Sequence, residues 1–393
     1  MFLRSASFVL FFITALLVSH PTALSQPAAD TSDASDFFTE WSVSSAEGLD
    51  AILLLGAISG DTLQASIYGD EIAFIREQLS SEALEAAARI DQTIRIENEG
   101  LTGPSLSYFF SAGPFETLED VLASARDPDR FIAPNLDLLI SWPEGRYEET
   151  LVIMPDVITV LEAFQAMDFG RWYQESYGDL IAQGIRQTRQ AVEPHDVIPE
   201  QARLLGRELD PLIEIRILAF SQPYGIRIAG QRFLAHYSYP AGIQLRVAAH
   251  EIFHPPYDVE DEGLFSSLRE LSEDPWMRSV VENHNPAFGY NSFEGLLNEG
   301  STQALDQFVS ERLGFAIDPG SRWGQHDGGM HMLAAALYHA MREDGFDQTG
   351  GRYEDWLHSA IARGWMTPEE VRRRARAVVG DAPVDHWYEV MED

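Results

Sequence analysis

Apolar residues recur at helical spacing along most of the first half of the chain. An early example is the set formed by Leu49, Ile52, Leu53 and Gly56. Residues 80–94 are mostly good helix formers, and residues 157–191 return to the same period. Between them, Thr117 stands where the N-cap of another helix is expected. The pattern predicts a mainly helical N-terminal region over residues 36–205.

Strand patterns are fewer. Residues 136–142 and 150–154 are short apolar runs that we interpret as strands. Residues 213–217 alternate apolar and charged side chains, as a half-buried strand does, and residues 226–239 are the next predicted strand. A largely apolar, buried helix is then expected over residues 242–254. We therefore expect an α+β fold, predominantly α, with a short antiparallel sheet before this last helix.

Composition narrows the class of protein. The chain has 393 residues, of which 45% are hydrophobic, so it is long enough for one large core or two ordinary ones. The formal charge is −35, and every cationic residue is arginine. Such a charge repels nucleic acid and anionic membrane surfaces, so a nucleic-acid partner is not expected. Cysteine is absent, so disulfides cannot contribute to stability.

The first 25 residues have the pattern of a signal peptide. Arg4 gives a positive start, residues 5–18 are almost wholly apolar, and Ala23 and Ser25 supply the small residues of a cleavage site. We expect an exported, periplasmic or extracellular protein that begins near Gln26; a retained membrane anchor is the alternative. No other segment is apolar over the length of a membrane span.

The predicted helix over residues 242–254 ends in His250-Glu251-Ile252-Phe253-His254. Histidines at positions i and i+4 project to the same side of an α-helix, so both imidazoles can bind one metal ion. Glu251 projects in another direction, where it can hold a water molecule beside that ion. Because Pro255 cannot continue the hydrogen-bond ladder, the helix is expected to end at His254.

A third ligand is expected downstream. The metzincin arrangement is excluded, because residues 255–258 lack its glycine and histidine. Asn291 and Glu294 can form a capping box at the start of another helix, and Glu299 falls on the flank of its apolar stripe. Glu299 is therefore a candidate for the third ligand. The alternatives are Asp258, Glu260 and His284.

These two helices resemble those of the thermolysin-like gluzincin metallopeptidases. That family places a His-Glu-x-x-His helix before a helix with Gly-x-x-Asn-Glu, which here is matched by Gly295, Asn298 and Glu299. The resemblance implies a zincin-like catalytic core, for which we take residues 206–393, and a Zn²⁺ ion held by His250, His254 and Glu299. Gln303 stands where the family has an aspartate that supports a ligand histidine.

The resemblance also implies a zinc-dependent peptidase that acts on a peptide or protein substrate. Glu251 is the expected general base. His326, in a glycine-rich loop, is our first candidate for stabilising the oxyanion; the others are Tyr290, His331 and Tyr338. A zinc hydrolase of non-peptide amides or esters and a non-catalytic exported helical binding module remain as alternatives.

Overall fold

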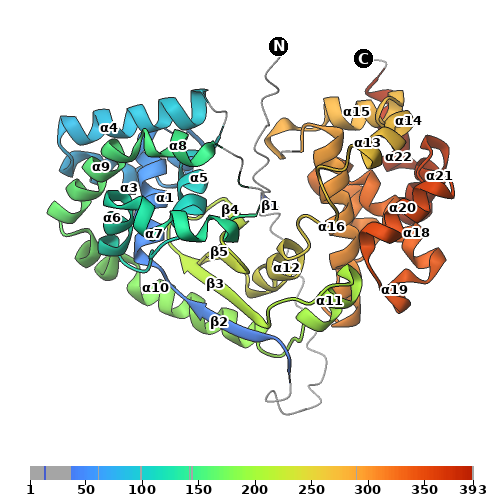
Figure 1. Cartoon of the computed structure of the whole chain (residues 1–393), viewed down its shortest axis with the longest axis horizontal. Helices are drawn as coiled ribbons and strands as arrows, with labels where there is room; N and C mark the ends of the chain where they lie inside the picture. Colours follow the sequence, from blue (N-terminus) through green and yellow to red (C-terminus); the bar gives the residue numbers. More distant parts are fainter. Residues whose placement is uncertain are drawn as a thin grey trace. The chain divides into compact units, whose positions relative to one another are not determined.

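The computed structural model describes residues 13–14, 37–60, 62–97, 100–140, 142, 145–288 and 290–391 (Figure 1). The predicted signal peptide and its cleavage site lie outside these residues, apart from 13–14. Helices dominate and one small mixed sheet accompanies them, which confirms the α+β, predominantly α prediction. No helix among the described residues is both long and apolar enough to cross a membrane.

The chain forms two compact units. The described part of unit 1 comprises residues 13–14, 41–192 and 213–244, and that of unit 2 comprises 37–40, 193–212 and 245–391. Both are therefore assembled from segments that are discontinuous in sequence.

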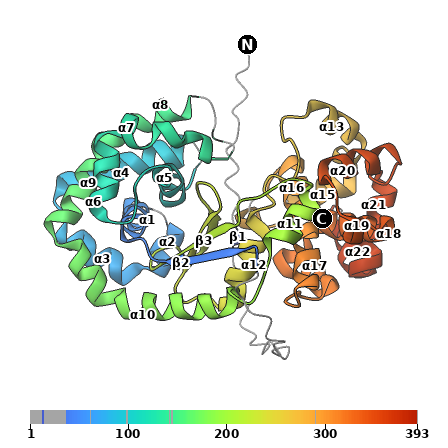
Figure 2. The ribbon, with the colours of Figure 1, turned by 60° about the horizontal axis from the view of Figure 1, so that its bottom comes forward.

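Unit 1 is built around α1 (Glu47–Ser59), which is buried on all sides and lies inside a ring of helices (Figure 2). Gly56 lets α5 approach closely, since a Cβ there would lie 2.4 Å from the backbone nitrogen of Gly103. The other helices of unit 1 are α2 (Thr62–Ile67), α3 (Gly69–Gln78), α4 (Ser81–Asp91), η2 (Gln92–Glu97), α5 (Thr102–Phe110), α6 (Leu118–Arg126), α7 (Pro128–Phe131), η3 (Ala133–Leu138), α8 (Arg146–Leu151), α9 (Met154–Ala166) and α10 (Phe169–Val192).

The sheet of unit 1 has the strand order β1-β4-β5-β3-β2. Its strands are β1 (Ile13–Thr14), β2 (Glu40–Ser44), β3 (Leu212–Leu218), β4 (Tyr224–Arg227) and β5 (Arg232–His236). β5 pairs antiparallel with β4 but parallel with β3. The prediction of an antiparallel sheet is therefore wrong for the β3–β5 pair. The chain turns back at Gly230, where φ is +67°, so the predicted strand 226–239 is split between β4 and β5.

Asp50 of α1 ties this helix to the end of β3. Its buried carboxylate accepts hydrogen bonds from the backbone N–H groups of Ala219 and Phe220, at 2.8 to 2.9 Å, and from the hydroxyl of Tyr173. Burial outweighs these donors and raises the pKa of Asp50 to about 7. Burial of Asp50 in unit 1 therefore disfavours the ionised form of this carboxyl group.

Unit 2 is mainly helical within the described residues, and α16 (Phe293–Arg312) is buried along most of its length. α16 packs against α11, α15 and α18. The helices of unit 2 are α11 (Ile198–Leu205), α12 (Ala241–Glu251, of which residues 241–244 belong to unit 1), α13 (Glu262–Ser267), α14 (Arg269–Ser272), α15 (Pro275–Asn283), η4 (Pro286–Phe288), α16, α17 (Pro319–Gln325), η5 (His326–Gly329), α18 (Met332–Asp344), α19 (Phe346–Thr349), α20 (Tyr353–Ala362), α21 (Pro368–Val379) and α22 (Asp381–Glu389).

Several local predictions can be compared with these elements. Thr117 is the N-cap of α6, and Asp120 completes a capping box with it, which confirms that start. The strands predicted at 136–142 and 150–154 are wrong, because those residues belong mainly to η3, α8 and the start of α9. Short apolar runs do not separate a strand from a buried helical turn, and the flanking proline and glycine residues here open helices.

Candidate metal centre

The end of α12 carries the two motif histidines. The α-helix stops at Glu251, three residues earlier than predicted. The chain then tightens, since the N–H of His254 donates to the carbonyl of Glu251, an i→i−3 bond of 3.3 Å. Pro255 explains the early end, because it biases the residue before it away from α geometry. The tighter turn keeps His250 and His254 on the same side.

A glutamine from α11 fixes this end of α12. The side-chain amide of Gln201 donates to the carbonyls of Ala249 at 2.9 Å and Ala248 at 3.3 Å. Both carbonyls lie in the last turn of the helix, so Gln201 binds the end of α12 that carries the motif. Gln201 is fully buried, so the position of the motif depends on α11.

The third candidate ligand lies on α16. Ser292 is the N-cap of this helix, with its hydroxyl accepting from the N–H of Gly295 at 3.0 Å, so the capping role predicted for Asn291 is wrong by one position. The helix is not amphipathic, because its polar residues from Asn298 to Gln307 are buried. Buried polar groups require partners. Asn298, Thr302 and Asp306 find theirs at the two histidines.

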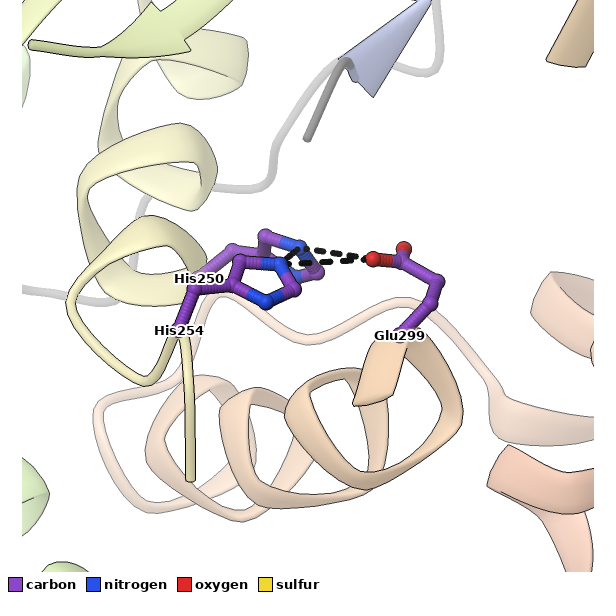
Figure 3. A group of neighbouring side chains, drawn as sticks. All are labelled: His250, His254 and Glu299. Atoms are coloured by element: carbon purple, nitrogen blue, oxygen red, sulfur yellow. Dashed lines mark hydrogen bonds and ion pairs between the residues drawn. The ribbon is translucent and has the colours of Figure 1, made fainter. Parts of the chain in front are cut away.

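Figure 3 shows His250, His254 and Glu299 pointing toward one another. The Nε2 atoms of the two imidazoles are 2.9 Å apart. Oε2 of Glu299 lies 3.4 Å from Nε2 of His250 and 3.3 Å from Nε2 of His254. All three side chains are buried. Their potential ligand atoms lie within 4.8 Å of one another, so the group could hold a metal ion. Zn²⁺ sites commonly use this set of two imidazoles and one carboxylate.

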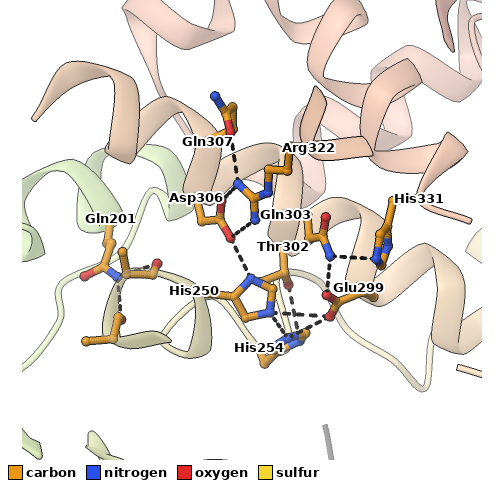
Figure 4. A network of polar contacts seen from close by, with 12 residues as sticks. Gln201, His250, His254, Glu299, Thr302, Gln303, Asp306, Gln307, Arg322 and His331 are labelled. Carbon is orange, nitrogen blue, oxygen red and sulfur yellow. Dashed lines mark hydrogen bonds and ion pairs between the residues drawn. The ribbon is translucent and has the colours of Figure 1, made fainter. Parts of the chain in front are cut away.

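The outer nitrogens define the tautomers of the two imidazoles. Nδ1 of His250 lies 2.6 Å from Oδ2 of Asp306 (Figure 4). Nδ1 of His254 lies 2.9 Å from Oδ1 of Asn298. Carboxylate and amide oxygens only accept, so each Nδ1 carries the proton and donates. Neutral rings in these tautomers direct their Nε2 lone pairs toward each other and toward Glu299. Three electron-rich atoms then face one another in a buried space, which favours a cation there.

The pKa shifts at this cluster indicate that its surroundings favour a positive charge. Burial disfavours a charged imidazole, but Glu299 and Asp306 outweigh burial and raise the pKa of His250 to about 10. Burial also opposes ionisation of Glu299, yet the two histidines lower the pKa of its carboxyl well below the ordinary value. Burial lowers the pKa of His254. The cluster therefore favours one positive charge beside the Glu299 carboxylate, supplied by a proton or by a metal ion.

Asp306 is itself supported by an arginine. Both of its oxygens accept from Arg322, with one bond of 2.9 Å from Nη2 to Oδ2. Burial alone would raise the pKa of Asp306, but Arg322 and His250 lower it below the ordinary value. The ionised Asp306 can therefore hold the His250 imidazole in its orientation. Sequence reasoning missed this pair, although Asp306 follows Glu299 by two helical turns and so lies on the same face of α16.

Tyr290 contacts the ligand Glu299, and Glu251 follows the ligand His250 directly in sequence. Glu251 is 1% exposed. Burial, followed by the charges of Glu299 and Glu251, raises the pKa of Tyr290 well above its ordinary value, so this hydroxyl stays protonated and can donate. Four residues were considered for stabilising the oxyanion. Of these, Tyr290 is the one with a pKa that is raised by the charges of both Glu299 and Glu251.

The remaining candidates are placed elsewhere. His326 is exposed at the start of η5, and among the described residues no hydrogen bond or ion pair joins it to the three ligands. Tyr338 donates to Glu311 at 2.7 Å. His331 is buried near Gln303, at 3.2 Å. The alternative third ligands are not part of the group formed by His250, His254 and Glu299. Asp258 and Glu260 are exposed, and His284 donates to the carbonyl of Val280.

Comparison with known proteins gives no relative. No family model, curated protein or solved structure matches the chain. The function is therefore inferred from the geometry of these residues.

Proposed function

We propose that this protein is an exported zinc-dependent hydrolase, a metallopeptidase of the gluzincin type, that acts on peptides or proteins in the periplasm or outside the cell. The observation that supports it most is the convergence of two imidazole nitrogens and one carboxylate oxygen, each from a buried side chain, with Glu251 next to them in sequence. A ligand set of three protein groups leaves a coordination position for water or substrate, which is the pattern of catalytic zinc.

His250, His254 and Glu299 would hold the ion, and bound zinc would polarise the substrate carbonyl and make the attacking water more acidic. Glu251 accepts a proton from that water and passes it to the leaving amine. Tyr290, which stays protonated, donates a hydrogen bond to the carbonyl oxygen as negative charge develops on it. Burial of these side chains strengthens each of their electrostatic contacts.

The test combines metal analysis with one substitution. Protein purified after growth with zinc should contain one zinc per chain, and it should hydrolyse members of a panel of peptides. Glu251→Gln should keep the zinc and lose hydrolysis, because an amide cannot accept the proton. Glu270→Gln makes the same change at an exposed glutamate of α14 and serves as the matched control.

Three results would count against the proposal. Failure to bind zinc on titration rejects the metal site. Zinc binding without cleavage of any peptide, ester or amide favours the non-catalytic binding module. Cleavage of esters or small amides but not peptides favours the non-peptide hydrolase, since the same chemistry attacks either carbonyl.

A further inference from the structure

Gln303 lies one helical turn after Glu299 on α16 and contacts its carboxylate directly. The side-chain Nε2 of Gln303 donates to Oε1 of Glu299 at 2.7 Å (Figure 4). Oε2 of the same carboxylate faces the two imidazoles, 3.4 Å from Nε2 of His250 and 3.3 Å from Nε2 of His254. The two oxygens of Glu299 therefore have different surroundings: one is bound by an amide, and the other faces the ligand nitrogens.

A tryptophan determines which end of the Gln303 amide faces Glu299. Nε1 of Trp323, which can only donate, bonds to Oε1 of Gln303 at 2.8 Å. This bond leaves the NH₂ end of the amide directed at Glu299. His331 borders the same NH₂ group, with its Nε2 at 3.2 Å, and is paired with Asp327 at 2.9 Å. With Trp323 fully buried, the amide is held in one orientation.

We infer that Gln303 is a positioning residue that limits Glu299 to a single ligand oxygen. This inference rests on the proposed function, since it concerns how the chain presents Glu299 to a metal ion. A carboxylate can bind zinc through one oxygen or through two. While Gln303 holds Oε1, only Oε2 is available, and a coordination position stays open for water. Without that amide, Oε1 would be free to turn toward the ion and compete with water for this position.

The inference predicts a specific combination of effects. Gln303→Met keeps the side-chain length without a donor, so the protein should still bind one metal ion with no loss of affinity. Any hydrolytic rate should fall by about 10–100-fold, the usual effect of changing a group that orients a ligand. The visible absorption of the Co²⁺-loaded protein should weaken, because Co²⁺ absorbs less as its ligand number rises. Trp323→Phe, which retains Gln303 but releases its amide, should change the spectrum in the same direction to a smaller extent.

The matched control is Tyr353→Phe. The hydroxyl of Tyr353 donates to Ser301 of α16 at 2.8 Å, so this variant also loses one buried hydrogen bond to the same helix but leaves the ligands untouched. All variants are loaded with Co²⁺ alone, their spectra are recorded, and affinity is measured by chelator competition. Tyr353→Phe should match the original protein in both measurements.

The outcomes separate this inference from the proposed function. Failure of the unaltered protein to bind Co²⁺ or Zn²⁺ rejects the proposed function itself. Normal binding by that protein together with an unchanged spectrum in Gln303→Met refutes the role of Gln303. A large loss of metal affinity in Gln303→Met also refutes it, because the amide would then be needed to hold the ligand in place and not to restrict it.

Discussion

Replacing Asp306 tests two contributions of this residue, one to folding stability and one to metal binding. Asp306 is 3% exposed and bonds to both Arg322 and His250. Asp306→Leu leaves the mostly buried guanidinium of Arg322 without its carboxylate, which typically costs about 3–5 kcal/mol of folding free energy. It also removes the acceptor that orients His250, which typically weakens metal binding by about 10–100-fold, or about 1.4–2.8 kcal/mol.

A double variant distinguishes the two effects. Asp306→Leu with Arg322→Met removes both charges, and an apolar pair of similar volume is often as stable as a buried ion pair. We expect the metal-free double variant to regain much of its stability in chemical unfolding. Its zinc affinity, measured by chelator competition, should stay as weak as that of Asp306→Leu, because His250 still lacks its acceptor.

Recovery of zinc affinity along with stability would refute this reasoning. It would mean that Asp306 affects metal binding only by keeping unit 2 folded. An unchanged affinity in Asp306→Leu would show that the bond from His250 to Asp306 does not matter for the metal.

Three further predictions concern single residues. Tyr290→Phe should lower any hydrolytic rate while zinc affinity stays the same, and a parallel loss of both would contradict its role as a donor to the substrate. Because burial raises the pKa of Asp50 from 3.8 to about 7, its contribution to stability is largest below pH 4 and declines as pH rises toward 7, by at most about 4 kcal/mol. Thermal melts should show this decline, and Asp50→Asn should flatten it. Gly300→Val should destabilise the protein by about 1–3 kcal/mol in urea unfolding, because even a Cβ at Gly300 lies 2.9 Å from Leu333 of α18; an unchanged unfolding midpoint would indicate that α18 moves freely.

The features of the candidate site that depend on residues close together in sequence could be predicted from the sequence. The spacing of His250 and His254 places both on one side of a helical turn, and this holds in the structure even though α12 ends early. The start of the α16 helix was predicted within one residue because capping side chains stand next to it. Interactions between residues within about one turn can be predicted from their order alone.

The partners of the ligands were not accessible in that way. Asp306 was not singled out, because its role depends on Arg322 and on the packing of α17 beside α16. Gln303 was considered only as a departure from the aspartate of the gluzincin pattern. The structure instead gives each ligand its own partner: Asp306 for His250, Asn298 for His254 and Gln303 for Glu299. The antiparallel prediction for the sheet was wrong for a related reason. The parallel pairing of β3 and β5 depends on long-range contacts, which the alternation of apolar and charged residues does not encode.

The dependence of α12 on Gln201 has a consequence for biosynthesis. A ribosome makes the chain from its N-terminus, and compact units fold as their segments become available. Unit 1 is fully synthesised once residue 244 has been added, whereas unit 2 needs 193–212 together with residues 245 onward. Helix α11 must therefore wait, with its packing partners still unmade, until α12 and α16 have been translated. The two histidines and Glu299 are all present only once residue 299 has been added, after every residue of unit 1 has been made.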